Sequence, residues 1–346
     1  MNIDNILDNE HWMFLEDNTD VAYYSLTIGL DEFFSTYHAI YLKLKAFDKS
    51  NRNYINEHTK DSTSYIKCYL NIAIHIQHFF ELETKRILEN EHKLYAVDDK
   101  GDPIILYKLL NGQTLDAEDT KELKSVEFSE AIVRLKKLVD NGIIQDEVAK
   151  ILVNNFKLLR ALNQLRNTII HRGKRIMLYC DIDDLFATHL LPVIKEIIEC
   201  KIHESILSRY KDNGYYDAIC AIIAEGKSAS LDYSKIAYAK EIGRCKNILS
   251  HGIIEKGKED KTYVEKIIAK RLKPWVEEVH LKGVKCPCCD NEAMFEGREL
   301  IGFDIDELGD ETSSVGGFRV IQIPEYAIYR ECGLCGFAYT DFIHIT

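Results

Sequence analysis

The sequence predicts a mainly α-helical protein, in which a helical bundle and additional helices are followed by a small β-rich unit. Apolar residues recur at helical spacing from about residue 21 to 200, and shorter amphipathic segments occupy 203–281. After residue 285, glycine, β-branched and aromatic residues become more frequent, in segments such as GGFRVIQI and FAYTDFIHI. We therefore expect three domains: a bundle at 1–200, a second helical unit at 201–282, and the β-rich unit at 283–346.

Two apolar stripes carry the helix predictions for the first domain. The first stripe comprises Tyr69, Ile72, Ile76, Phe79 and Phe80. The second stripe comprises Val148, Leu152, Phe156, Leu159, Leu162, Leu165 and Ile169. Glu81 and Lys85 are spaced four residues apart, which predicts an ion pair on the polar side of the first helix.

Shorter amphipathic segments predict the other helices. They lie near 127–139, 182–199, 214–225, 232–251 and 262–279. The acidic segment 94–126 contains Gly-Asp-Pro and Asn-Gly, which are turn signals, so we expect an irregular insertion there. Four or five helices joined by short links in the first domain imply a bundle.

Composition and charge narrow the classes of protein. The apolar fraction of 46% and the charged fraction of 29% are typical of a soluble globular protein. No apolar run reaches the roughly 18 residues of a membrane span, and the acidic N-terminal segment has no signal-peptide core. We therefore expect a cytoplasmic protein without membrane contact. No glycine-rich phosphate-binding motif supports ATP or dinucleotide chemistry.

The charge is unevenly distributed along the chain. A net charge of −12 argues against a general polyanion binder. Residues 134–175, however, hold ten Lys or Arg against three acids, a local net charge of +7. This basic segment predicts either solvated helix faces or a local binding site for an anion.

The C-terminal cysteines have the spacing of a metal site. Cys286 with Cys289 and Cys332 with Cys335 form two Cys-x2-Cys pairs, which can surround one tetrahedral ion with four thiolates. We expect Zn²⁺ in a structural role, because four cysteine ligands leave no position for water. A redox pair and a cluster of free thiols are the competing interpretations, and Cys288 could replace Cys289 as a ligand. The segment 285–346 resembles zinc ribbons, with an enlarged hairpin between the pairs.

Five further cysteines are scattered singly. They are Cys68, Cys180, Cys200, Cys220 and Cys245. Single cysteines in a chain without a secretory signal are more often buried thiols than members of disulfides.

Two similar polar motifs lie 80 residues apart. RNTIIHRG occupies 166–173 and KNILSHG occupies 246–252. The candidate catalytic residues in and beside them are Arg166, Asn167, His171, Arg244, Asn247 and His251. Each Asn lies about 40° from its His around an ideal helix, whereas Arg166 and His171 lie about 140° apart. Convergence of that pair therefore requires a loosened helix or a second motif opposite it.

These residue types suit phosphate-ester chemistry. A neutral His171 could accept the proton of a ribose 2′-OH, or donate one to the leaving oxygen when protonated. Arg166 could stabilise the charge of the transition state, and Asn167 could orient the imidazole or the phosphate. One histidine does not easily perform both proton transfers, which favours paired motifs. The alternative to a catalytic role is a structural one, in which the histidine lies near the C-terminus of a helix that the following glycine terminates.

The first motif and its helical context resemble the HEPN superfamily, whose all-helical bundles carry Arg-x4–6-His. The resemblance rests on LNQLRNTIIHRG and on the earlier helix HIQHFFELETKRIL, and it covers roughly residues 21–200. The second motif departs from the pattern, because Lys246 stands beside Asn247 and Arg244 is displaced.

The resemblance implies a metal-independent endoribonuclease, a toxin or anti-phage abortive-infection effector that acts on RNA. It also implies a homodimer or higher homo-oligomer, and an antitoxin or defence-system protein as a partner. Some HEPN relatives are non-catalytic modules for nucleotide or RNA binding, dimerisation or regulation, so this alternative stays open. A purely structural partner in a defence complex, with the ribbon as docking surface, is a third hypothesis.

Overall fold

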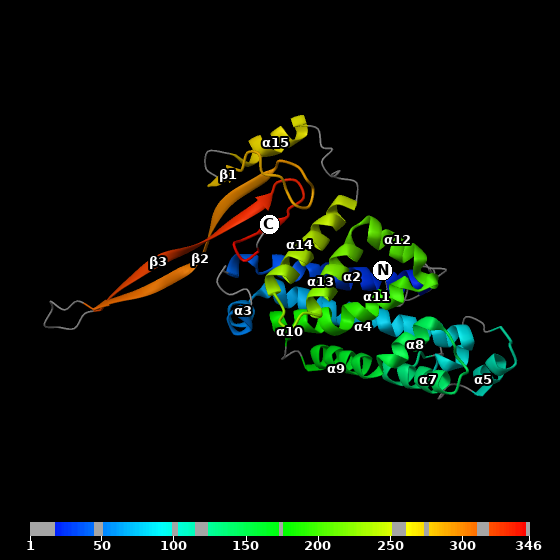
Figure 1. Ribbon diagram of the computed structural model, residues 1–346. Helices are drawn as coiled ribbons and strands as arrows, with labels where there is room; N and C mark the ends of the chain where they lie inside the picture. The colour runs from blue at the N-terminus through cyan, green and yellow to red at the C-terminus, as the bar shows by residue number, and fades with distance from the viewer. Residues whose placement is uncertain are drawn as a thin grey trace, which may run out of the picture. The chain divides into compact units, whose positions relative to one another are not determined.

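Figure 1 presents the computed structural model of the chain, in which most of the ordered elements are helices. The structure describes residues 18–44, 51–98, 103–114, 124–172, 176–250, 261–272, 277–309 and 318–343. The prediction of a mainly α-helical protein with a small β-sheet near the C-terminus is confirmed. None of the helices in these ranges is long and apolar enough to cross a membrane.

The chain divides into two compact units. Unit 1 contains Met1–Leu30 and Leu70–Arg175, and unit 2 contains Asp31–Tyr69 and Ile176–Thr346. The unit boundaries fall within α2 (Asn18–His38) and α4 (Thr63–Glu91), so each of these helices contributes residues to both units. The three sequential domains expected from the sequence stay a prediction.

Unit 1 is built from helices. Besides its shares of α2 and α4, it contains η4 (Lys93–Tyr95), α5 (Pro103–Leu110), α7 (Phe128–Asp140), α8 (Glu147–Asn154) and α9 (Phe156–Arg172). The apolar stripe that begins at Val148 is divided between α8 and α9. Helix α8 ends because the Asn155 side-chain amide donates to the carbonyl of Ile151, and the chain then restarts as α9. Val148, Leu152, Leu159, Leu162 and Ile169 are buried, as a core stripe should be.

Unit 2 combines helices with the sheet. Its helices are η2 (Tyr41–Lys43), α3 (Arg52–Thr59), α10 (Tyr179–Leu185), the π-helix η5 (Phe186–Leu190), α11 (Leu191–Glu199), η6 (Lys201–His203), α12 (Glu204–Asp212), α13 (Tyr215–Gly226), α14 (Tyr233–Ser250) and α15 (Lys261–Arg271), with the remainders of α2 and α4. Helix α15 ends at Arg271, and the prediction of a helix to residue 279 is wrong at Glu278 and Val279, which belong to strand β1 of the sheet.

The helical core of unit 2 encloses a charged pair. Lys240 of α14 and Asp183 of α10 form an ion pair, and both side chains are fully buried. The Lys240 ammonium also donates to Thr36 Oγ1 at 2.8 Å. It lies over the rings of Phe33 and Tyr179, at 4.5 and 4.4 Å from their centroids. A buried ammonium needs such partners, because its transfer from water is costly.

The sheet is antiparallel with the order β1-β2-β3-β4. Strands β2 (Met294–Gly309) and β3 (Phe318–Cys332) form the long hairpin visible in Figure 1, which confirms the enlarged hairpin expected between the cysteine pairs. Its register shifts between Leu300 and Gly302, as at a β-bulge. Strand β4 is only Ala338–Tyr339. The base of the hairpin, where β2 begins and β3 ends, places the two cysteine turns side by side.

Candidate functional site

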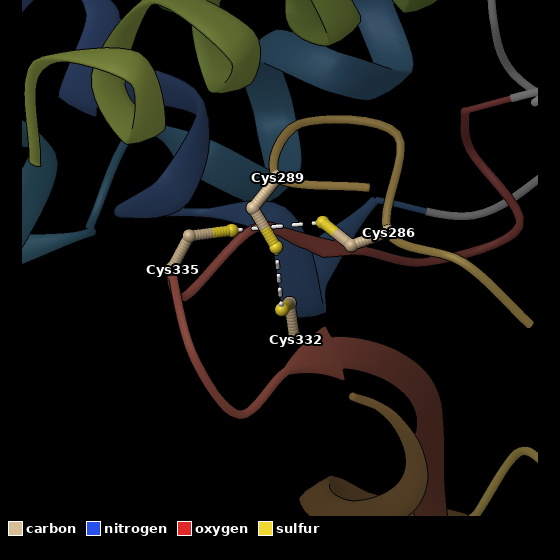
Figure 2. A group of neighbouring side chains, drawn as sticks. All are labelled: Cys286, Cys289, Cys332 and Cys335. Atoms are coloured by element: carbon tan, nitrogen blue, oxygen red, sulfur yellow. Dashed lines mark hydrogen bonds between the residues drawn. The ribbon is translucent and has the colours of Figure 1, made fainter. Parts of the chain in front are cut away.

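The four predicted metal ligands come together at the base of the hairpin. Cys286 and Cys289 precede β2, and Cys332 and Cys335 lie at the end of β3 and in the turn after it. The Sγ atoms of Cys286 and Cys335 are 3.5 Å apart, and those of Cys289 and Cys332 are 3.6 Å apart (Figure 2). All four sulfurs lie within 4.8 Å of one another, and all four side chains are buried.

Backbone hydrogen bonds shape both cysteine turns. The amide of Cys286 donates to the carbonyl of Asn291, and the amide of Gly336 donates to the carbonyl of Cys332. Gly336 has a φ of 70°, a conformation that glycine adopts without strain. The first turn closes with Asp290, a non-glycine residue at a φ of 60°.

The sulfur positions fit a tetrahedral metal ion. Four thiolates at about 2.3 Å from one ion are separated by about 3.8 Å from each other, close to the spacing of the two sulfur pairs. The structure places Cys289, and not Cys288, in this set. The four cysteines are therefore compatible with a metal site, whose ion the distances alone do not identify.

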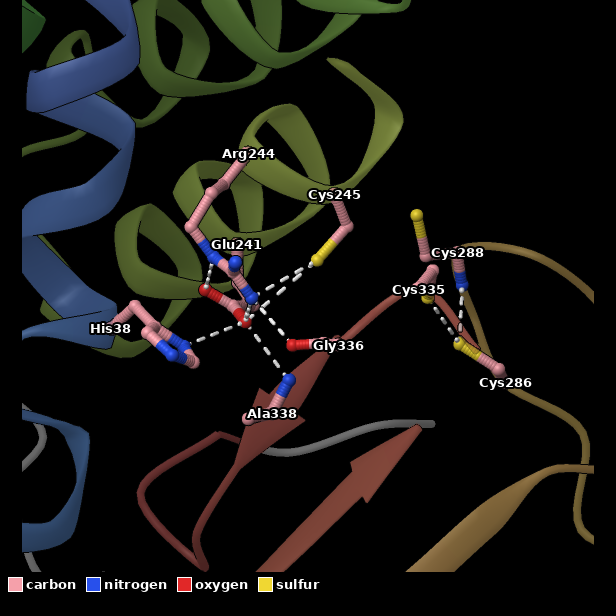
Figure 3. Close-up of polar contacts among 9 residues, drawn as sticks. All are labelled: His38, Glu241, Arg244, Cys245, Cys286, Cys288, Cys335, Gly336 and Ala338. Carbon is pink, nitrogen blue, oxygen red and sulfur yellow. Dashed lines mark hydrogen bonds and ion pairs between the residues drawn. The ribbon is translucent and has the colours of Figure 1, made fainter. Parts of the chain in front are cut away.

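The turn that carries Cys335 packs against helix α14 through a buried carboxylate (Figure 3). Glu241 is fully buried and accepts from the amide of Ala338 at 2.9 Å. It also accepts from Nε of Arg244 at 3.0 Å, and it lies 3.3 Å from Nδ1 of His38. Arg244 in turn donates to the carbonyl of Gly336. These bonds attach the cysteine-bearing turn after β3 to helix α14 and, through His38, to helix α2, all within unit 2.

Burial and hydrogen bonding have opposite effects on the pKa of Glu241. Burial alone would raise its pKa, but hydrogen bonds from His38 and Arg244 outweigh it, and the pKa lies below the ordinary 4.5. The carboxylate is therefore the form that unit 2 stabilises.

The second sequence motif lies partly in this contact. Arg244 is committed to Glu241 and to the turn at Gly336. Asn247 falls within α14, but its side chain lies outside the described residues, as does all of His251. The candidate catalytic role of these three residues stays a prediction.

The first motif lies at the end of α9, in unit 1. Arg166 is half-buried and donates from Nη1 to the side-chain oxygen of its neighbour Asn167 at 3.0 Å. Its Nε is buried and has no hydrogen-bond partner among the residues that the structure describes. His171 is exposed, and the described residues give it no hydrogen bond with either of the other two. The structure thus joins Arg166 to Asn167 but leaves His171 apart, as the 140° separation predicts.

Sequence reasoning missed a histidine beside this motif. His78 of α4 is half-buried, and its Nδ1 lies 2.8 Å from the buried hydroxyl of Ser25. Burial lowers the pKa of His78 below 6.5; Glu81 opposes this shift, and the positive charges of Lys85 and Arg166 add to it. Its spacing within an apolar stripe made it look like an ordinary helix residue.

The predicted pair of Glu81 and Lys85 is present, with Lys85 Nζ at 2.6 Å from the carboxylate. The side chains are only 16% and 21% exposed, for Lys85 and Glu81 respectively, so the pair is not on a solvated face. Glu81 also accepts from Gln77 at 3.1 Å. Unit 1 therefore contains a partly buried polar cluster of Gln77, Glu81 and Lys85, and the charges of Glu81, Lys85 and Arg166 act on the pKa of His78.

Comparisons of this chain with models of known protein families, with curated proteins and with solved structures find no match. The geometry of the cysteine set and of the polar residues of unit 1 is therefore the basis for a functional assignment. Of the two sets, the polar residues of unit 1 include groups that can transfer protons and bind an anion.

The effect of the Arg166 charge on the pKa of His78 can be tested directly. Arg166→Gln is expected to raise the pKa of His78, because it removes a positive charge that disfavours the imidazolium. An NMR titration of the His78 ring protons measures the shift. Arg160→Gln, on an exposed position of the same helix, is the matched control and should leave that pKa unchanged. An unaltered His78 pKa in Arg166→Gln would contradict the effect of the Arg166 charge on His78.

Proposed function

We propose that the protein is a metal-independent endoribonuclease of the HEPN type. The observation that carries the proposal is the contrast between two arginines. The charge of Arg244 is compensated by buried Glu241. Arg166 is half-buried, pairs with no described carboxylate and keeps a buried Nε without a partner among the described residues. A preorganised guanidinium that lacks a counter-charge is suited to bind a phosphate.

The proposed reaction is attack of a ribose 2′-OH on the adjacent phosphate. Arg166 binds the phosphate and stabilises the charge that develops on its oxygens, and Asn167 holds the guanidinium in position. His171 transfers a proton at the reacting oxygens. The exposed position of His171 suits contact with a large substrate such as RNA.

A second proton-transfer group is needed, and His78 is our candidate within unit 1. Its lowered pKa favours the neutral imidazole at pH 7, which is the form that accepts a proton from the 2′-OH. Nδ1 of His78 is hydrogen-bonded to Ser25, and in the tautomer in which Nδ1–H donates to the hydroxyl, Nε2 is the nitrogen that can accept a proton. The motif of a second subunit would be the other source of this group, which is why we include a homodimer in the proposal.

The decisive experiment is RNA cleavage by the purified full-length chain in EDTA. We expect products ending in a 2′,3′-cyclic phosphate, and a loss of about 10²–10⁴-fold in rate for His171→Ala. His58→Ala replaces another exposed histidine, and should retain full activity. Circular dichroism of each variant checks that the helices are intact. Cleavage by folded His171→Ala at the wild-type rate would overturn the assignment.

The second candidate function is a non-catalytic module that binds RNA or nucleotides or mediates dimerisation. The net charge of −12 favours it, since it disfavours sustained contact with a long polyanion outside the basic segment. In that case the wild type would bind RNA without turnover, and Arg166→Ala would weaken binding while His171→Ala would not.

We assign the four-cysteine set to Zn²⁺, held by Cys286, Cys289, Cys332 and Cys335. Thiolate ligands and tetrahedral spacing favour Zn²⁺ among the common metal ions. Bound zinc would fix the ribbon in its fold and would leave no position for a reacting water. In the proposed setting the protein is a cytoplasmic toxin or anti-phage effector, and an antitoxin or defence-system protein restrains it.

A further inference from the structure

Helix α14 adds a cysteine to the thiols of the ribbon. The Sγ atoms of Cys245, Cys288 and Cys335 all lie within 4.8 Å of one another. Their side chains are at most 1% exposed. Figure 3 shows Cys245 on α14, with its sulfur also in contact with Arg244 and Glu241, and Cys288 and Cys335 on the neighbouring turns. Three segments, each more than 40 residues from the next in the sequence, thus bring thiols close to one another.

Two of these thiols have no role in the four-cysteine site. Cys286 and Cys289 form the Cys-x2-Cys pair, so Cys288 is not one of the four ligands. Cys245 belongs to α14, which lies outside the ribbon. Only Cys335 is common to both groups. The leftover thiols nevertheless converge on it instead of packing separately into the apolar core, as Cys200 does.

We propose that Cys245, Cys288 and Cys335 hold a second thiophilic metal ion, with the Cys335 thiolate bridging it to the ion of the four-cysteine site. Sulfurs around a tetrahedral Zn²⁺ are about 3.8 Å apart, which three sulfurs confined within 4.8 Å can satisfy. The six thiols then supply seven of the eight positions of two tetrahedral ions, because Cys335 counts twice. A water completes the second ion.

The Cys245 thiol lies between a cation and an anion of α14. Its Sγ is 3.2 Å from Nη2 of Arg244 and 3.8 Å from the Glu241 carboxylate, to which the protonated thiol donates, so binding a metal ion would replace that weak hydrogen bond. The same guanidinium reaches the Gly336 carbonyl, next to Cys335 in the chain. The second ion would therefore attach the ribbon to α14 directly, in addition to the contacts of Glu241.

Metal content is the first test. We expect the full-length chain, purified after growth with zinc, to carry two zinc ions per chain by elemental analysis and native mass spectrometry. Cys245→Ser and Cys288→Ser should each carry one. Cys200→Ser is the matched control and should carry two, because Cys200 lies outside both cysteine groups and its thiol donates to the Glu196 carbonyl, as a serine hydroxyl can. One ion in the wild type, unchanged in Cys245→Ser, would overturn the proposal.

Native mass spectrometry also distinguishes metal binding by these thiols from the formation of a disulfide between them. A disulfide between Cys245 and Cys288 would lower the mass by two hydrogens and leave one zinc, which would equally overturn the second site.

Cadmium NMR tests the bridge without relying on a variant that folds. Exchange of zinc for ¹¹³Cd in the wild-type chain should give two resonances, each split by coupling through the shared sulfur. A single resonance, or two resonances without mutual splitting, would refute the bridged pair. These measurements do not depend on RNA cleavage, so they are informative whether or not the proposed nuclease activity is found.

Discussion

Asp183→Asn is expected to lower the free energy of unfolding by about 3–5 kcal/mol, because it leaves the Lys240 ammonium buried without a counter-charge. Lys240 and Asp183 are both fully buried, in contact with each other. Burial lowers the pKa of Lys240, and the Asp183 carboxylate opposes that shift. Thr36 and two aromatic rings complete the surroundings of the ammonium but carry no full charge. Chemical denaturation of wild type and variant measures the loss.

The matched control replaces both partners. Lys240→Met with Asp183→Leu removes the two charges together and fills a similar volume, so it should recover most of the stability lost in Asp183→Asn. If the single variant costs less than about 1 kcal/mol, or the double variant is less stable than the single, the pair does not have the electrostatic role that its burial indicates.

Glu241→Ala should release the cysteine-bearing turn from α14 and cost about 3 kcal/mol, because Arg244 and the Ala338 amide would lose their acceptor in a buried contact. Hydrogen exchange at the Ala338 amide measures the release locally. Glu57→Ala is the control: Glu57 also belongs to an ion pair, with Lys60, but at the surface, where such a pair contributes little to stability. Protection of Ala338 at the wild-type level in Glu241→Ala would contradict the contact.

The same carboxylate predicts a dependence on pH. The pKa of Glu241 is lower in the folded chain than the ordinary 4.5, so its contribution to stability is complete above pH 4.5. As the pH falls through the folded pKa, protonation removes that contribution. The protection factor of the Ala338 amide, which corrects for the slower intrinsic exchange in acid, should therefore fall as the wild type is acidified, and in Glu241→Gln this part of the acid dependence should be absent.

The predictions that succeeded depend on short stretches of sequence. Local turn geometry brings together the two sulfurs of each Cys-x2-Cys pair, the pattern identified the two pairs as one metal site, and the structure brings the four cysteines together at the base of the β2–β3 hairpin. The helical stripes succeeded for the same reason, since burial of one face every 3.6 residues is a local rule. The stripe that begins at Val148 was predicted less accurately, because Asn155 caps α8 and the stripe is divided between two helices.

The predictions that failed or were not made depend on contacts between distant segments. Glu278 and Val279 were assigned to a helix, but pairing with β2 makes them part of a strand. Cys245 looked like one of five scattered thiols, because nothing near it in sequence reveals Cys288 and Cys335. No prediction was made for Lys240, whose partner Asp183 lies 57 residues earlier in the sequence. Such pairings are properties of the folded chain and leave no periodic signal.

Helix α14 has consequences for how this sequence can change over evolutionary time. Consecutive residues of one rigid helix serve opposite purposes: Lys240 faces the charged core, whereas Glu241, Arg244 and Cys245 face the ribbon. A single inserted or deleted codon between the two groups would turn every later side chain by about 100° and shift it by about 1.5 Å along the axis. Substitutions along α14 can be absorbed one at a time, but its length between these positions is fixed.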